Sequence, residues 1–315
     1  MVTVTESALA ADVRAGLWND PPSLPARWFY DERGSRLFDE ITRLPEYYPT
    51  RRETEILNYC SDEIADITNA TTLIELGSGM STKTRLLLDA FTAARPEVRF
   101  VPVDVSAEVL TEAADALDEE YPRITIQPFV ADFTETLGEL PGPHGSRLLI
   151  LLGGTIGNLE PIQRAAFLDE IVAALAPGDH LLLGTDLVKS PSRLVAAYDD
   201  SSGVTAAFNR NLIEVLRREL DADGLYVDDF QHVVRWNPAH SRVEMWLRAR
   251  RPVHAYFRAL DRAWRLPAGA EILTEISTKF RLADLHAELD RHALRPARRW
   301  TDERGDYCLT LAAAT

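Results

Sequence analysis

Short apolar runs alternate with amphipathic helical stretches over residues 71–188, and this alternation constrains the fold more than any other feature of the sequence. The runs read TTLIEL, VRFVPVDV, ITIQPFVADF, RLLILLGG and DHLLLGTDLV, and helical stretches such as SAEVLTEAADALDEEY lie between them. Strands that are apolar throughout and separated by helices are typical of a parallel sheet covered on both faces. We therefore predict an α/β domain with a doubly wound, Rossmann-like sheet.

The segments outside this alternation have a different pattern. Residues 6–60 read as helices broken by proline-rich turns, and we expect no strands there. After Asp186, a helical stretch precedes strand-like alternation around the turn NPAH, and a last helix and a closing strand follow. These patterns indicate a discontinuous chain in which an insertion joins the N-terminal part. The predicted domains are residues 52–188 plus 280–315 for the α/β sheet, and residues 1–51 plus 189–279 for a second, α+β domain.

Composition excludes several classes of protein. A net charge of −15 argues against nucleic acid as a partner, because phosphate backbones are bound by basic faces. Cys60 and Cys308 form no C-x-x-C motif, and the seven histidines show no ligand spacing, so we expect no metal. The N-terminus lacks the pattern of a signal peptide, and the longest apolar run is too short to span a bilayer. We expect a cytoplasmic monomer that acts on a small molecule and does not bind a membrane.

A glycine turn follows the first apolar run, in the stretch LIELGSGMSTKTRLLL. From Gly77 it is one residue away from a Walker loop, because Thr82 stands where the second glycine should be, before Lys83 and Thr84. As a dinucleotide fingerprint it lacks the third glycine at the same position. The turn alone is therefore compatible with a kinase, a dehydrogenase or another protein that binds a nucleotide-sized ligand.

Acidic residues at the ends of the next two runs narrow the choice of ligand. Asp104 lies 25 residues beyond Gly79, where an acid can accept hydrogen bonds from ribose hydroxyls. Asp132 and Phe133 offer an acceptor for an exocyclic amine and an aromatic face for a purine. S-adenosylmethionine fits this arrangement, with its carboxylate near Lys83, whereas NAD fits less well because its pyrophosphate would be poorly cradled.

Several longer motifs resemble one family of enzymes. They read WFYDERGSRLFDEITRLPEYYPTRRE, IELGSGMSTKTRLLLDA, LLGGTIGNL, LLGTDLVK, AYDDSSGVTAAFNRN, RVEMWLRA and LTEISTKFR. Together they resemble the histidine Nα-methyltransferases that make hercynine, the first step of ergothioneine biosynthesis. The resemblance runs from about residue 10 to the C-terminus. It implies a class I methyltransferase sheet with a discontinuous substrate-binding domain. The alternatives are a methyltransferase for another aromatic amino acid and a catalytically silent module that senses the cofactor or histidine.

The resemblance also implies a set of site residues. S-adenosylmethionine, with S-adenosylhomocysteine as its product, would be held by Gly77, Lys83, Asp104, Asp132 and Phe133. Histidine would be held by Tyr47, Asn158, Tyr198, Met245, Glu275, Ile276 and Ser277. In this set Asn158 and Tyr198 fix the amino and carboxylate end. Tyr47, Glu275 and Ser277 meet the imidazole, and Met245 lines the ring pocket. The implied catalytic residues are Tyr30, near the amine, and Asn158.

The chemistry of methyl transfer from a sulfonium agrees with such a site. The reaction is an in-line displacement by a neutral amine, so the protein contributes mainly placement. A protonated amine must first lose its proton, at about 1.4 kcal/mol for each pKa unit. Tyr30 is our candidate to accept that proton, and its alternative role is aromatic packing. Because a site that hydrogen-bonds a substrate group rejects analogues without it, Glu275 is the predicted specificity residue.

Overall fold

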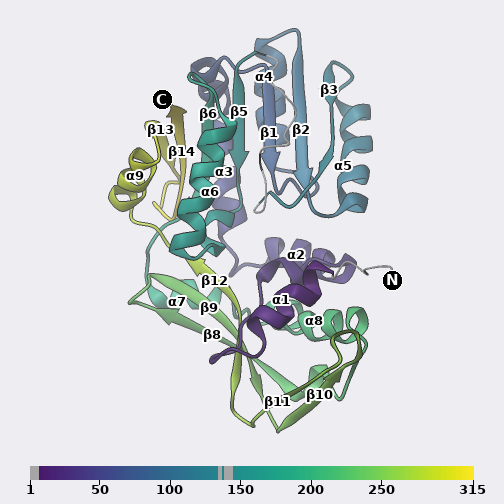
Figure 1. Ribbon diagram of the computed structural model, residues 1–315. Coiled ribbons are helices and arrows are strands. Elements are labelled where there is room, and N and C mark those ends of the chain that lie inside the picture. Colours follow the sequence, from purple (N-terminus) through teal and green to yellow (C-terminus); the bar gives the residue numbers. More distant parts are fainter. Residues whose placement is uncertain (1–6, 134–136, 138–144) are drawn as a thin grey trace. The chain divides into compact units, whose positions relative to one another are not determined.

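A computed structural model describes residues 7–133, 137 and 145–315, and its chain divides into two compact units (Figure 1). The α+β unit comprises the chain up to Tyr48 together with Lys189–Thr278. The α/β unit comprises Pro49–Val188 and Lys279–Thr315. Each unit is therefore discontinuous in sequence, with divisions after Tyr48, Val188 and Thr278, where the sequence predicted divisions after residues 51, 188 and 279.

The α/β unit contains one large sheet with the strand order β13-β14-β6-β5-β1-β2-β3, and β4 also pairs with β2. The strands from β3 to β6 in this order are parallel, whereas β14 is antiparallel to both of its neighbours. The predicted Rossmann-like α/β fold is confirmed. The strand bounds are β1 Thr72–Leu76, β2 Val98–Asp104, β3 Ile124–Ile126, β4 Phe129–Val130, β5 Arg147–Leu151, β6 His180–Asp186, β13 Leu294–Thr301 and β14 Tyr307–Ala314.

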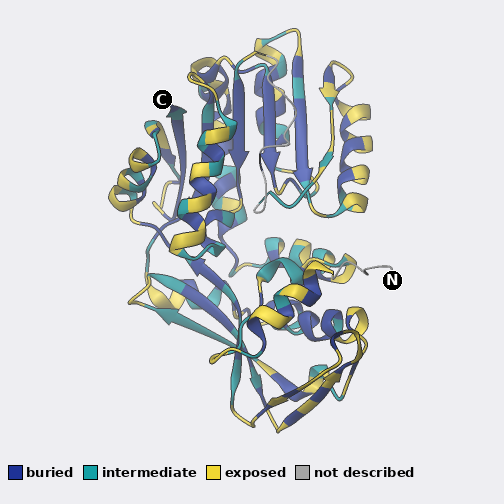
Figure 2. Ribbon diagram, in the orientation of Figure 1, coloured by how far each residue is buried: buried dark blue, intermediate teal, exposed yellow. Residues whose placement is uncertain are grey.

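Helices cover both faces of this sheet because its strands are apolar on both sides. Every residue of β1 and of β5 is buried, and successive residues enter different cores. Leu73 belongs to the core that contains residues of α3 and α4, while Ile74, on the opposite face, belongs to the core that contains residues of α6 and α9. Figure 2 shows the central strands of this sheet as buried. The helices of this unit are α3 Pro49–Thr68, α4 Arg85–Ala94, α5 Ala107–Glu120, α6 Pro161–Ala174, α9 Leu282–Arg291 and the short 3₁₀ helix η2 Thr155–Asn158.

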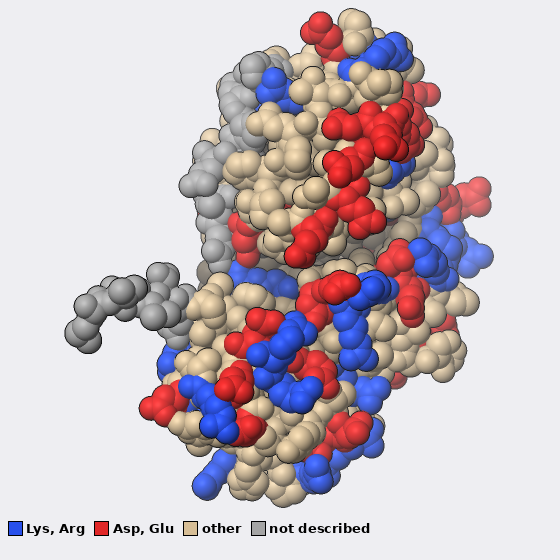
Figure 3. Space-filling view, turned by 90° about the vertical axis from the view of Figure 1, so that its right-hand side faces the viewer, with Lys and Arg blue, Asp and Glu red and all other residues tan. Residues whose placement is uncertain are grey.

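Helix α5 shows how the acidic composition is accommodated. Leu110, Ala113 and Leu117 form its buried side, and acidic residues occupy its exposed side. Figure 3 shows acidic side chains gathered on the face of the α/β unit to which α5 belongs. Part of the negative charge is thus carried by the solvated surface of α5. None of the helices in the described parts of the chain has the length and apolar character that crossing a bilayer requires.

The α+β unit packs helices against two small antiparallel sheets, with strand orders β12-β9-β8 and β11-β10-β7. Its core gathers around α8, whose buried side includes Phe208, Leu212 and Leu216. The helices are α1 Ala8–Gly16, α2 Glu32–Arg43, α7 Pro191–Ala196 and α8 Val204–Glu219, with 3₁₀ turns η1 Ala26–Phe29, η3 Val227–Asp229 and η4 Arg258–Leu260. The strands are β7 Ala222–Asp223, β8 Phe230–Asn237, β9 Arg242–Ala249, β10 Val253–Phe257, β11 Arg262–Leu266 and β12 Glu271–Thr278.

Two features of the fold differ from the sequence-based expectations. Strand β13 was not predicted, because half of its residues are exposed and three are arginines, as on a sheet edge. The N-terminal segment, where no strand was expected, forms an isolated bridge between Ser23 and Leu273. Leu24 N donates to Leu273 O at 2.9 Å, so this segment extends the edge of β12.

Candidate active site

The glycine turn after β1 lies against an aromatic ring in the α/β unit. Gly77 has a φ of +69°, and a Cβ atom there would lie 3.3 Å from the ring of Phe133. Glycine permits both the left-handed backbone and this close approach. Gly77 N donates to Val103 O at 2.8 Å, which joins the turn to the end of β2. The structure therefore brings the predicted residues Gly77 and Phe133 together.

Asp104 ends β2 beside the same turn. Its Oδ2 accepts a hydrogen bond from Gly79 N at 2.9 Å, and its Oδ1 accepts one from Ser106 N at 3.1 Å. Asp132 is half-buried and directly precedes Phe133. Among the described residues, Ser78 Oγ in the turn is buried and has no hydrogen-bond partner. An acid, an aromatic face and an unpaired hydroxyl thus lie at the carboxyl ends of β1 and β2, where ligands of such sheets bind.

Lys83 lies in the turn before α4, which begins at Arg85. Its ammonium forms an ion pair with the carboxylate of Glu53 on α3. The Glu53 side chain is 1% exposed, and that of Lys83 is 22% exposed. The lysine can therefore meet a ligand on one side while it remains paired on the other.

Sequence reasoning missed Glu53. Its carboxylate also accepts hydrogen bonds from Gly153 N at 2.9 Å and from Tyr307 Oη at 2.9 Å. Gly184 on β6 makes room for this cluster, because a Cβ atom there would lie 2.2 Å from Glu53 Oε1. The available sequence signal was a glutamate on the apolar side of a helix, a placement that requires partners.

Asn158 lies a few residues beyond this cluster. Gly153 and Gly154 both have left-handed backbones, with φ of +77° and +72°, and lead into η2. Asn158 ends η2 and is half-buried. The carboxylate of Glu53 thus connects Lys83 with the turn that positions Asn158, although these residues are far apart in the sequence.

A second buried acid, Glu75, holds the glycine turn from beneath. Its carboxylate accepts hydrogen bonds from the hydroxyls of Thr84 and Ser81. Burial raises the pKa of Glu75 to about 7, against the opposing effect of the hydrogen bond from Thr84. The residues from Ser81 to Thr84 are therefore tied to β1 through a carboxyl group that titrates near neutral pH.

In the α+β unit, a β-bulge determines which face of β12 carries the predicted specificity residue. Leu273 pairs with Trp246, and the next pair is Glu275 with Met245, so Thr274 is the extra residue of the bulge. Directly paired residues share a face, which places Glu275 beside Met245. Ser277 follows on the same face by alternation. Ile276 pairs with Glu244 and points to the opposite face, so only its backbone can share a site with these side chains.

Three predicted tyrosines lie in the same unit and are linked by contacts. Tyr198 Oη and Ser277 Oγ are 2.8 Å apart and share a hydrogen bond. The ring of Tyr198 packs edge-on against Tyr47 at a centroid distance of 6.2 Å. Phe38 lies between Tyr47 and Tyr30, with its ring 5.5 Å from that of Tyr30. The Tyr30 side chain both packs in this aromatic row and remains 36% exposed.

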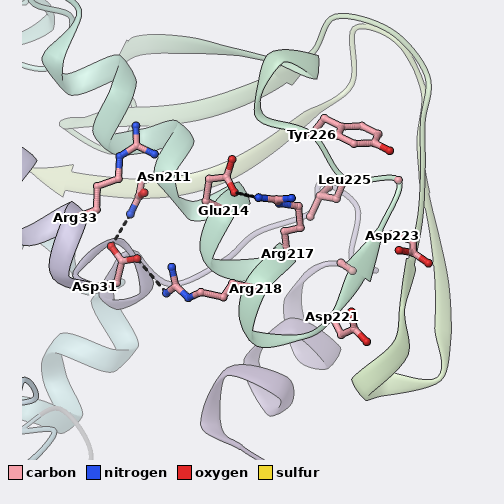
Figure 4. Close-up of a pocket in the computed structure, with 12 residues that line it drawn as sticks. Asp31, Arg33, Asn211, Glu214, Arg217, Arg218, Asp221, Asp223, Leu225 and Tyr226 are labelled. Carbon is pink, nitrogen blue, oxygen red and sulfur yellow. Dashed lines mark hydrogen bonds and ion pairs between the residues drawn. The ribbon is translucent and has the colours of Figure 1, made fainter.

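A hollow elsewhere in the α+β unit contains none of the predicted site residues. It has a volume of about 660 Å³ and lies beside α8 (Figure 4). The charges that line it include the pairs Arg217 with Glu214 and Arg218 with Asp31. In the described residues, no three histidine, cysteine, aspartate or glutamate side chains form a group that could hold a metal ion.

Comparison with solved structures identifies the class of fold. The CcbJ methyltransferase from Streptomyces caelestis matches this chain with a TM-score of 0.51 at 14% sequence identity. The match covers 91% of this chain and 100% of that chain. This likeness shows that the fold is that of a methyltransferase.

Comparison of sequences identifies the family. A family described as "Histidine-specific methyltransferase, SAM-dependent" matches residues 9–314. The histidine N-alpha-methyltransferase of Mycolicibacterium smegmatis is 55% identical over 97% of this chain and 94% of its own length. That of Mycobacterium tuberculosis is 54% identical over 97% of this chain and 95% of its own length. The chain belongs to the histidine-specific, S-adenosylmethionine-dependent methyltransferases.

Proposed function

We propose that this protein transfers three methyl groups from S-adenosylmethionine to the α-amino nitrogen of L-histidine. The products are hercynine and S-adenosylhomocysteine, and the reaction is the first step of ergothioneine biosynthesis. The observation that carries the proposal is the set of side chains on one face of β12 and β9. There the bulge places the carboxylate of Glu275 beside Met245, and Ser277 is hydrogen-bonded to Tyr198. Membership of the histidine-specific family supports it.

The residues of the α/β unit fit the methyl donor. We assign the ribose to Asp104, whose carboxylate lies beside the glycine turn. The adenine would lie by Asp132 and Phe133, and the methionine carboxylate by Lys83. The absence of a side chain at Gly77 lets the ring of Phe133 lie against the turn, and the unpaired Ser78 hydroxyl offers a further contact. We expect no metal to take part.

The residues of the α+β unit supply the contacts for histidine. We assign the imidazole to Tyr47, Glu275 and Ser277, because a carboxylate and hydroxyls can pair with both ring nitrogens. Met245 lines the ring on the same face as Glu275. We assign the amino and carboxylate end to Tyr198 and to Asn158, the latter a residue of the α/β unit, and Ile276 contributes through its backbone. Anchoring the ring while the amine end turns allows successive methylations of one nitrogen.

The protein's part in the reaction is to present a neutral amine in line with the methyl group. When bound, S-adenosylmethionine supplies an electrophilic methyl group, and an N–C bond forms as the C–S bond breaks, with its electron pair left on sulfur. Each transfer is accompanied by the net loss of one proton from the histidine nitrogen. Tyr30 accepts this proton as its own hydroxyl proton passes to water, which its partial exposure permits. Asn158 orients the amine.

Product analysis tests this function. Purified protein is incubated with S-adenosylmethionine and L-histidine, and tandem mass spectrometry locates the added methyl groups. We expect three methyl groups on the α-nitrogen, with three equivalents of S-adenosylhomocysteine. Methylation of the imidazole ring, or no methylation of histidine, would contradict the proposal.

A further inference from the structure

A buried polar network underlies the histidine-binding face of the α+β unit. Thr274 Oγ1 lies 2.7 Å from Asn209 Oδ1 and 3.0 Å from Met245 O. Asn209 Nδ2 lies 2.8 Å from His232 Nδ1, and His232 Nε2 lies 2.9 Å from Tyr198 O. Thr274 and Asn209 are fully buried, and the His232 side chain is 3% exposed. The network runs from β12 through α8 and β8 to the turn after α7.

One contact determines how the protons are arranged. Asn209 Nδ2 also lies 3.2 Å from Trp246 O, and a carbonyl oxygen can only accept. The amide nitrogen of Asn209 must therefore face both Trp246 O and His232. Since that nitrogen donates, His232 Nδ1 has to accept, and the ring proton resides on Nε2. His232 in this tautomer donates to the carbonyl of Tyr198.

The network holds the backbone at residues that we assign to the substrate. It reaches the carbonyls of Met245 and Tyr198, and Thr274 directly precedes Glu275 in the bulge. Tyr198 lies in the turn after α7, outside any strand that could fix it. Its hydroxyl shares a hydrogen bond with Ser277, and its carbonyl accepts from His232. His232 thus helps to hold Tyr198 in place, in addition to the backbone hydrogen bond from Tyr198 N to Val195 O.

We propose that His232 is a positioning residue for histidine binding: its Nε2–H holds Tyr198, and protonation of its ring disrupts the network that keeps Tyr198 in place. The inference rests on the proposed function, because it concerns the same histidine site. It assigns to His232 a role through Tyr198, with no direct contact to substrate. It also predicts that acid weakens histidine binding through the protein itself.

Protonation disrupts the network because Asn209 cannot adapt. A proton on Nδ1 would face the donating Nδ2 of Asn209, and rotation of that amide would turn its oxygen toward Trp246 O. Burial lowers the pKa of His232. The hydrogen bond to the carbonyl of Tyr198 and the negative charges of Asp199 and Asp200 oppose this effect, whereas the positive charge of Arg210 adds to it. Asp199 Oδ1 is 4.0 Å from Nε2, and Asp200 Oδ1 accepts a hydrogen bond from Thr205 N in the first turn of α8 at 2.7 Å. The ring is therefore neutral at pH 7 and becomes charged only in acid.

Two substitutions separate the hydrogen bond from the titration. In His232→Leu neither remains. In His232→Gln an amide N–H can still reach the carbonyl of Tyr198, but nothing titrates. His286→Gln in the α/β unit is the matched control, because burial also lowers the pKa of that histidine. The KM for histidine, the Kd for S-adenosylmethionine and the melting temperature are measured for all four proteins over a range of pH.

We expect His232→Leu to raise the KM for histidine about tenfold or more at pH 7, with an unchanged Kd for S-adenosylmethionine. His232→Gln should bring the KM for histidine at pH 7 most of the way back to the wild-type value. In acid its KM should rise less steeply than that of the wild type and of His286→Gln. An unchanged KM in His232→Leu would overturn the inference, as would a wild-type acid dependence in His232→Gln. If His232→Leu does not fold, the pH dependence of His232→Gln decides. A wild-type enzyme that fails to methylate histidine contradicts the proposed function itself.

Discussion

The ammonium of Lys83 is paired with the carboxylate of Glu53, a residue of α3 that is shielded from solvent. Glu53 also accepts hydrogen bonds from Gly153 and Tyr307, so one carboxylate joins four segments of the α/β unit. A lysine that we assign to the methyl donor is thus held in place by a partner on its protein side. The pair links the folding of this unit to its binding site.

Removing one partner of this pair is expected to lower the free energy of unfolding more than removing both partners. Lys83→Met leaves a buried carboxylate without a cation, which costs about 3 kcal/mol of unfolding free energy. Adding Glu53→Gln should recover much of that stability, since a neutral amide remains. Affinity for S-adenosylmethionine should stay low in both proteins, because the cation is absent. Chemical denaturation and calorimetry measure the two quantities, and recovery of affinity in the double variant would refute a ligand contact by Lys83.

Glu275 is expected to control the choice of amino acid. In Glu275→Ala the imidazole of histidine loses a charged partner, so kcat/KM for histidine should fall by about 100-fold or more. The Kd for S-adenosylmethionine should not change. Glu271→Ala is the matched control on the same strand, because Glu271 pairs with Arg235 and Arg248. Equal losses in the two variants, or an equal loss of cofactor affinity, would remove Glu275 from the site.

Tyr30 is expected to act on the rate more than on binding. Tyr30→Phe keeps the ring that packs on Phe38 and Phe208 but lacks the hydroxyl. We expect kcat to fall about tenfold or more near pH 7, with little change in the KM for histidine. The deficit should shrink as the pH rises, since the free amine then forms without help. Tyr226→Phe, at an exposed tyrosine, is the control. A deficit that is the same at every pH would argue for packing alone.

Glu75 is expected to make the protein less stable as the pH rises. Its pKa is raised from 4.5 to about 7 by burial, so the folded protein holds this proton more tightly than the unfolded chain does. The resulting stabilisation is complete below pH 4.5 and is lost as the pH rises to about 7, by up to about 3 kcal/mol. Glu75→Gln should lose this part of the pH dependence, while Glu112→Gln on the exposed side of α5 should retain it. Denaturation at about pH 5 and about pH 8 gives the change in the free energy of unfolding between these two conditions for each protein. An equal change in the wild type and in Glu75→Gln would show that Glu75 ionises normally.

The sequence predicts those parts of the site that depend on local pattern. Asp104 and Phe133 follow apolar runs, and the carboxyl ends of parallel strands meet at one edge, so their proximity could be expected. Glu53 could not be placed in this way, because its partners are 30, 100 and 254 residues away. Only the packing of α3 against the sheet brings them together.

The bulge at Thr274 is the second feature that the sequence does not predict. Alternation along β12 fixes which residues share a face only while the register is regular, and one extra residue exchanges the faces. The bulge pairs Glu275 with Met245 and leaves Ile276 opposite Glu244. Which residues point together therefore depends on cross-strand pairing and on the Asn209 contact, neither of which can be read along one strand.

The most direct test of the central claim is a competition among substrates. The protein is incubated with S-adenosylmethionine and an equimolar mixture of the free amino acids, and mass spectrometry follows every one of them. The account predicts that histidine alone gains methyl groups and that the final product carries three on its α-nitrogen. Methylation of another amino acid in preference to histidine would contradict it.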